Sequence, residues 1–149
     1  MAETKSRGGA TLSAEERQAV KDRARELKEQ KTAADGLKAV TEAIAKLSGD
    51  DQKIANKLHE IVMDTAPGLA PKTYYGMPGW ARDGKILCFF QPASKFGTRY
   101  GTFGFEQPAN LDDGDMWPTS FALLKVGPAE EKSLRALVTT AISGPARLP

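Results

Sequence analysis

The sequence predicts a single α+β domain with N-terminal helices, a four- or five-stranded antiparallel meander and one C-terminal helix. Apolar residues recur at helical spacing up to residue 65 and again after residue 128. Between these regions lie all 11 aromatic residues, from Tyr74 to Phe121, in a stretch rich in glycine and turn signals. Strands that follow one another without intervening helices favour an antiparallel sheet. A chain of 149 residues is long enough for one core and short for two domains.

The first segment, residues 1–12, is polar and predicts a disordered tail. A helix is expected from Ser13 to about Lys31, because Ser13 and Glu16 form a capping-box pattern. Charged side chains make up 11 of the 19 residues from 13 to 31. The apolar stripe on this helix is thin and consists of Val20, Ala24 and Leu27. We therefore expect residues 13–31 to form a loosely attached charged helix, either a solvated surface helix or an arm for a partner.

Three further helices follow from the apolar periodicity. Asp35 is predicted to cap a second helix, and Ser48-Gly49-Asp50-Asp51 ends it and begins a third. A closing helix starts at Pro128 and stops before Gly144-Pro145, which leaves a tail at residues 145–149. The expected buried positions are Leu37, Val40, Ile44 and Leu47, then Ile54, Leu58, Ile61 and Val62, and finally Leu134, Leu137, Val138, Ala141 and Ile142.

The strands are predicted from turn signals. Asp83-Gly84 is typical of a tight hairpin turn, which pairs residues 80–82 with residues 85–91. Further strands are expected at residues 98–105 and 119–126, with a short edge strand at residues 72–75. Phe103 and Phe105 share one strand face and are expected beneath the helices.

Composition excludes several classes of function. The formal net charge is only +2, which gives no electrostatic case for nucleic acid or for an anionic membrane. The start of the chain has no apolar segment of the kind that secretory signals carry, and no apolar run approaches the length of a membrane span. With a single cysteine there is no internal disulfide, so a cytoplasmic location is expected.

The sequence offers few residues that could carry out catalysis. The one histidine, His59, is expected at the boundary of the third helix. Cys88 lies in an apolar strand, where burial makes a thiol inert. The sequence holds no phosphate-binding loop and no dinucleotide fingerprint. We therefore expect a protein that is not an enzyme.

The excess of aromatic residues predicts a binding site. Helices cover one face of a sheet, and more aromatic side chains are present than one core absorbs. An aromatic, partly basic concavity suits a small ligand with an anionic or carbonyl group. It equally suits a protein partner or a homodimer interface, and the same rings also fit a second small core. The expected lining residues are Tyr75, Met77, Trp80, Lys95, Arg99 and Trp117.

An acidic loop offers a second candidate site. Hard oxygen ligands for a cation are available from Glu106, Asp112, Asp113 and Asp115, although loops also favour aspartate and glycine for turn chemistry alone. The spacing does not match a calcium-binding loop.

Several segments resemble the YdhG-like family of small bacterial domains. The most specific is Ala70-Pro71-Lys72-Thr73-Tyr74-Tyr75-Gly76-Met77-Pro78, supported by Gly84 to Phe90, Asn110 to Gly114, Met116-Trp117-Pro118 and Leu58 to Val62. The resemblance spans residues 14–143. It implies a two-layer α+β fold of frataxin-like character, of largely unknown function. One branch is described as an intracellular iron chaperone, so the resemblance implies iron as a possible cargo of the acidic residues.

Overall fold

The computed structural model describes residues 12–29 and 32–143. Residues 1–11 of the predicted N-terminal tail lie outside the described residues, and so does the predicted tail at residues 145–149. The elements in chain order are α1 (Ala14–Glu29), α2 (Ala33–Ala45), α3 (Gly49–Thr65), β1 (Ala70–Pro71), β2 (Gly79–Arg82), β3 (Lys85–Gln91), α4 (Ala93–Phe96), β4 (Gly101–Phe105), β5 (Ser120–Leu123) and α5 (Pro128–Ser143). The predicted α+β class is confirmed.

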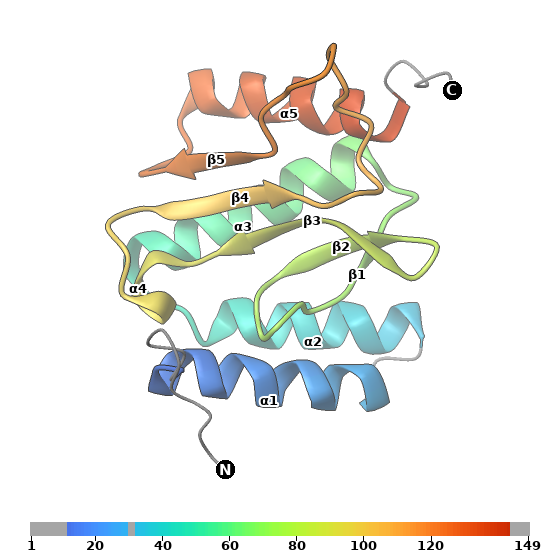
Figure 1. Cartoon of the computed structure of the whole chain (residues 1–149). Helices are drawn as coiled ribbons and strands as arrows, with labels where there is room; N and C mark the ends of the chain where they lie inside the picture. Colours follow the sequence, from blue (N-terminus) through green and yellow to red (C-terminus); the bar gives the residue numbers. More distant parts are fainter. Residues whose placement is uncertain (1–11, 30–31, 144–149) are drawn as a thin grey trace.

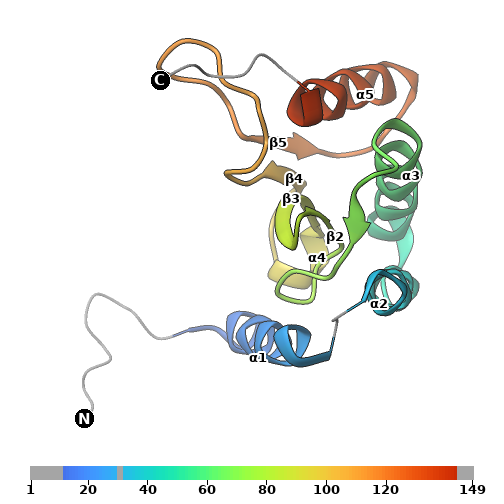
Figure 2. The same cartoon turned by 90° about the vertical axis from the view of Figure 1, so that its right-hand side faces the viewer.

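The five strands form one antiparallel sheet in the order β1-β2-β3-β4-β5, so the predicted meander is confirmed (Figure 1). Helices α2, α3 and α5 lie on one side of this sheet and form the second layer, while α1 lies apart from them below the strands (Figure 2). Within the described residues, no helix combines the length and the apolar character that crossing a bilayer requires.

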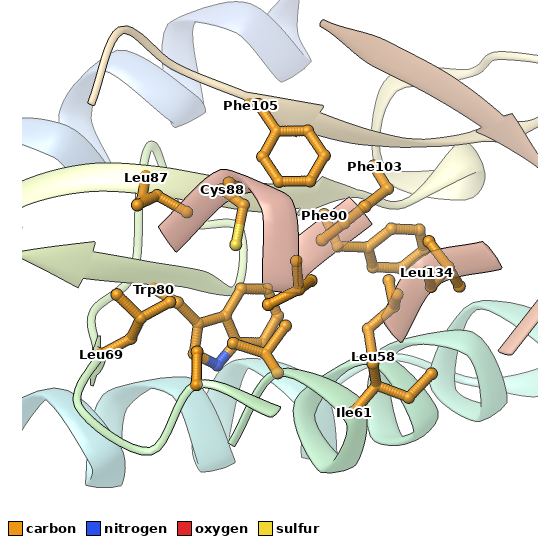
Figure 3. Packing of buried hydrophobic residues seen from close by; sticks show 14 of the residues in the cluster. Leu58, Ile61, Leu69, Trp80, Leu87, Cys88, Phe90, Phe103, Phe105 and Leu134 are labelled. Carbon is orange, nitrogen blue, oxygen red and sulfur yellow. The ribbon is translucent and has the colours of Figure 1, made fainter. Parts of the chain in front are cut away.

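The core lies between the sheet and α3 and α5. Residues directly opposite one another on antiparallel strands share a face of the sheet. Cys88 is paired with Trp80 on β2 and with Phe105 on β4, while Phe90 is paired with Phe103. All five side chains are buried in one cluster together with Leu58, Ile61 and Leu134 from the helices (Figure 3). The expectation that Phe103 and Phe105 lie beneath the helices is confirmed.

Two predicted local structures are confirmed at the level of hydrogen bonds and dihedral angles. The Ser13 hydroxyl accepts from the Glu16 amide at 3.0 Å, and Glu16 accepts from the Ser13 amide at 2.9 Å, which completes the capping box of α1. Asp83 and Gly84 have φ angles of 52° and 79°, as a two-residue hairpin turn requires.

Several details differ from the prediction. Strand β5 is shorter than the predicted residues 119–126, and Leu37, which was expected to be buried, is 47% exposed. Thr32, not Asp35, caps α2, because its hydroxyl accepts from the Asp35 amide at 3.0 Å. The edge strand is Ala70–Pro71, not residues 72–75, and it packs closely on α2, where a Cβ at Gly36 would lie 2.0 Å from the Pro71 oxygen. Strand β4 starts at Gly101, because the short helix α4 and the turn after it use the preceding residues.

His59 accepts a hydrogen bond from the indole of Trp80, with 3.1 Å between Nδ1 and Nε1. The fully buried Trp80 needs a partner for its N–H group, because an unpaired buried donor costs about 1–3 kcal/mol. This hydrogen bond requires an unprotonated Nδ1, and burial lowers the pKa of His59 below its ordinary value. His59 is therefore the acceptor for the largest core side chain.

We expect the free energy of unfolding to fall as the pH is lowered from about 7 to about 5. The unfolded chain takes up a proton on His59 near the ordinary pKa of 6.5, whereas the folded chain resists protonation until lower pH. The stabilisation is complete above that value and is lost as the pH falls. Urea unfolding at a series of pH values measures the change.

His59→Gln is the control, because glutamine keeps an acceptor oxygen and does not titrate. Subtracting its pH profile from that of the wild type removes the contribution of the carboxylates. Identical profiles for the two proteins would contradict the assignment.

Candidate functional site

Helix α1 docks on the rest of the molecule through charged side chains. The predicted apolar stripe does not face inward: Val20 is 50% exposed, Leu27 is 63% exposed and Ala24 is exposed as well. Within residues 14–27, the buried positions are Ala19, Asp22 and Glu26, with Asp22 8% and Glu26 4% exposed. Their spacing defines a helix face rotated away from the predicted one. Polar contacts therefore attach α1, and the apolar residues of the predicted stripe point to solvent.

The surface that receives α1 is a tight turn formed by residues 74–77. Tyr74 and Met77 exchange two backbone hydrogen bonds, of 2.8 and 2.9 Å. The two central residues, Tyr75 and Gly76, have φ angles of 54° and 80°, which defines a primed hairpin turn. A left-handed conformation at a bulky residue such as Tyr75 costs roughly 1–2 kcal/mol. Other contacts must therefore stabilise this turn.

The Glu26 carboxylate supplies those contacts. One oxygen accepts from the Tyr75 amide at 2.9 Å, and the other accepts from the Gly76 amide at 2.6 Å. Hydrogen bonds from N–H groups to a charged carboxylate are stronger than bonds between neutral groups. Arg23 lies 3.5 Å from Glu26 and offsets part of its charge.

Asp22 forms a second polar contact beside the turn. Its carboxylate lies 2.6 Å from Arg25 and accepts from Gln18 at 3.0 Å, both on α1. It also lies 3.7 Å from the ammonium group of Lys95 on α4. Lys95 and Asp22 therefore join α4 to α1 next to Gly76, where a Cβ would lie 2.4 Å from Asp22 and 3.1 Å from Lys95 Nζ.

An aromatic strip extends from this turn across the open face of the sheet. The strip consists of Tyr75, Tyr74 and Phe89, with 4.8 and 5.4 Å between successive ring centroids. Arg23 lies over both tyrosine rings, at 5.1 and 5.6 Å from their centroids. The Tyr74 hydroxyl donates to Glu106 at 3.1 Å, and burial together with this carboxylate raises the pKa of Tyr74. All three rings are half-buried, so the strip is a partly covered aromatic surface and not a second core.

Between α1, α2 and the turn lies a polar cleft of about 490 Å³. Three carboxylates and three cationic groups line it, together with hydroxyl groups and small apolar side chains. The lining residues are Asp22, Arg25, Glu26, Ala39, Glu42, Ala43, Lys46, Leu47, Ser48, Thr73, Gly76, Ser94 and Lys95. This volume lies within the usual range for small-molecule sites.

The structure brings together only part of the predicted aromatic site. Lys95 lines the cleft, and Tyr75 lies at its edge in the turn beside Gly76. Met77 is 5% exposed and Trp80 is fully buried, so neither lines a surface pocket. The reason is that Trp80 shares its strand face with Cys88 and points toward the helices.

The other two predicted residues lie apart from the cleft. Arg99 is exposed and lies 5.2 Å from the ring centroid of the neighbouring Tyr100. Trp117 is half-buried in the loop between β4 and β5, which Figure 2 shows at the opposite end of the sheet from α1. Cys88 is fully buried, and burial raises the pKa of its thiol, so it is protonated at neutral pH.

The predicted iron ligands have no common site. In the described part of the chain, no three histidine, cysteine, aspartate or glutamate side chains lie together in a way that could hold a metal ion. Glu106 instead accepts the hydrogen bond of Tyr74. Asp112 is half-buried and Asp113 and Asp115 are exposed in the long loop.

Sequence reasoning missed Asp22, Arg23, Glu26 and Thr73, and it placed Tyr74 in an edge strand. The signal was present in part, because Ala19, Asp22, Arg23 and Glu26 recur at i, i+3, i+4 and i+7. A charged face at this spacing is ordinarily solvated, so the pattern alone does not indicate docking. The turn that receives it is 49 residues away from Glu26 in the chain.

No protein-family profile, no curated protein and no solved structure matches the chain. The resemblance to the YdhG-like family stays a prediction.

Gly76→Ala tests the contact between the turn and α1, and Gly84→Ala is its matched control. Both glycines have φ near +80°, but nothing lies within 4 Å of a Cβ at Gly84. We expect Gly84→Ala to cost about 1 kcal/mol of stability, from the backbone conformation alone. Gly76→Ala should cost roughly 1–2 kcal/mol more, because the new methyl group displaces the buried Asp22 carboxylate from its partners.

Urea unfolding measures both losses, and hydrogen exchange at the amides of α1 locates the effect. Exchange should become faster in α1 for Gly76→Ala and stay unchanged for Gly84→Ala. Equal losses of stability, with α1 unaffected in both variants, would show that the contact does not hold α1.

Proposed function

We propose that this protein is a non-catalytic binding domain that holds a small polar molecule in the cleft between α1, α2 and the turn at residues 74–77. The observation that carries the proposal is the cleft itself: a volume of about 490 Å³ lined by charged groups of both signs. Contacts with one another and with the turn hold Asp22, Arg25 and Glu26 in place, so this part of the lining is already positioned for a ligand. A ligand that bears an anionic or carbonyl group finds several complementary partners there.

The chemistry of the lining favours binding over catalysis. The residues that line the cleft include no histidine and no cysteine. Of its hydroxyl groups, from Ser48, Thr73 and Ser94, that of Ser94 donates to the Asp51 carboxylate, which also accepts from the Ala93 and Ser94 amides and so serves as a structural acceptor for α4. Such a lining positions and neutralises a polar ligand without an obvious group to transform it.

A second candidate function is the docking of a protein partner or of a second copy of the chain. The observation in its favour is the outward-facing apolar stripe of α1, where Val20 is 50% exposed and Leu27 is 63% exposed. The residues of α1 that line the cleft are Asp22, Arg25 and Glu26, and not those of the apolar stripe. The two functions are therefore compatible.

Native mass spectrometry of the freshly purified protein, compared with the same sample denatured, tests these functions. We expect an organic adduct that Ala43→Phe removes, because Ala43 lines the cleft on α2 and a phenyl ring there fills the space. Ala136→Phe is the matched control, since Ala136 is an exposed helical position on α5.

An adduct that persists in Ala43→Phe would place the ligand elsewhere and contradict the cleft as its site. A mass of twice the chain would favour the partner-docking function. Bound iron would favour the iron-chaperone alternative that the resemblance implies.

A further inference from the structure

We infer that the backbone amides of Tyr75 and Gly76, with the ammonium group of Lys95 beside them, form a carboxylate-binding subsite of the cleft, which Glu26 of α1 fills in this structure. A ligand carboxylate would take the place of Glu26 and release the middle of α1. The inference rests on the proposed function and names the chemical class that the cleft selects.

Part of what holds the turn in shape lies within the turn itself. The hydrogen bonds between Tyr74 and Met77 close the turn without any residue of α1. Two consecutive left-handed residues then aim both N–H groups to the same side, which creates a concave anion-binding arrangement. Glu26 accepts one hydrogen bond on each carboxylate oxygen, at 2.9 and 2.6 Å, and so shows how a carboxylate fits.

Lys95 completes the recognition of a negative charge. Its Nζ lies 3.1 Å from the position that a Cβ at Gly76 would occupy, and the Asp22 carboxylate, with which it pairs at 3.7 Å, lies 2.4 Å from that position. The cation therefore offsets the charge of Asp22 next to the amide pair. Gly76, Lys95 and Glu26 all line the cleft. A ligand whose carboxylate binds the two amides therefore has the rest of the cleft available for its other groups.

The attachment of α1 is of a kind that a ligand can replace. Within residues 14–27 of α1, the buried side chains apart from Ala19 are Asp22 and Glu26, and both are held by ionic or hydrogen-bonding contacts. Val20 and Leu27 already face solvent, and the apolar side chain of α1 that is buried, Ala19, is small, so little apolar surface of the helix itself holds it in place. Replacing one carboxylate with another leaves the number of hydrogen bonds to the turn unchanged.

The experiment uses the full chain labelled with ¹⁵N and follows the amide signals of Tyr75 and Gly76. The probe is sodium acetate, exchanged for sodium chloride at constant ionic strength so that general salt effects cancel. We expect Glu26→Ala to give a saturable shift of both amides, with acetate bound at least about tenfold more tightly than in the wild type, because the internal competitor is absent. Adding Lys95→Ala should weaken this binding about threefold.

Two further variants keep the test decisive. Glu15→Ala removes an exposed carboxylate from the same helix and should bind acetate as the wild type does. Glu26→Gln keeps an acceptor oxygen and similar volume, so it maintains the turn and should raise acetate affinity by a smaller factor than Glu26→Ala. Absence of a saturable shift at Tyr75 and Gly76 in both Glu26 variants would overturn the inference. Tighter binding of inorganic phosphate than of acetate would overturn the carboxylate class.

The result is separable from the test of the proposed function. An adduct that Ala43→Phe removes, without any acetate response at the turn, would overturn the carboxylate subsite and leave the binding function intact. An acetate response with an adduct that Ala43→Phe does not remove would contradict the cleft as the site of the whole ligand.

Discussion

The alternation of side chains along paired strands is the constraint on which the rest of this structure depends. Once β3 places Cys88 and Phe90 toward the helices, Phe89 must point to the other face. The ring of Phe89 lies over Gly104, where a Cβ would approach it to 2.5 Å, so the open face carries a half-buried aromatic side chain. That side chain needs cover that α3 and α5 cannot provide. Tyr74 supplies it, and the position of Tyr74 sets the position of the turn beside α1.

The position of the turn at residues 74–77 determines how α1 attaches. Its outward-facing amides need acceptors, because polar backbone groups that are removed from water without a partner are costly. The Glu26 carboxylate accepts a hydrogen bond from each of the two amides, of Tyr75 and Gly76. Asp22 adds an ionic contact to Lys95 on α4. A charged helix face therefore packs inward while Val20 and Leu27 remain outside. The same arrangement encloses the polar cleft, so the site and the attachment of α1 have a single physical origin.

Much of the fold could be predicted from local sequence. The capping box at Ser13 and the primed turn at Asp83-Gly84 involve neighbouring residues, and the structure confirms both. The candidate site was predicted only in part. Lys95 and Tyr75 belong to it, but Trp80 does not, because a β-bulge between Trp80 and Ala81 and the register with Cys88 direct the indole into the core. His59 gained its role as the acceptor for Trp80 from that same register, which no local pattern reveals.

The sequence by itself determined the sheet topology, the order of the elements other than α4, and the apolar core other than Leu37, because these depend on periodicity and turn chemistry within short windows. Only the tertiary structure decided which face of α1 packs inward and where the cleft forms. Both depend on contacts between residues about 50 positions apart, such as the Glu26 carboxylate and the Gly76 amide. A charged helix has no apolar stripe strong enough to fix its orientation, so the orientation follows from the hydrogen-bonding groups that the folded sheet presents to it.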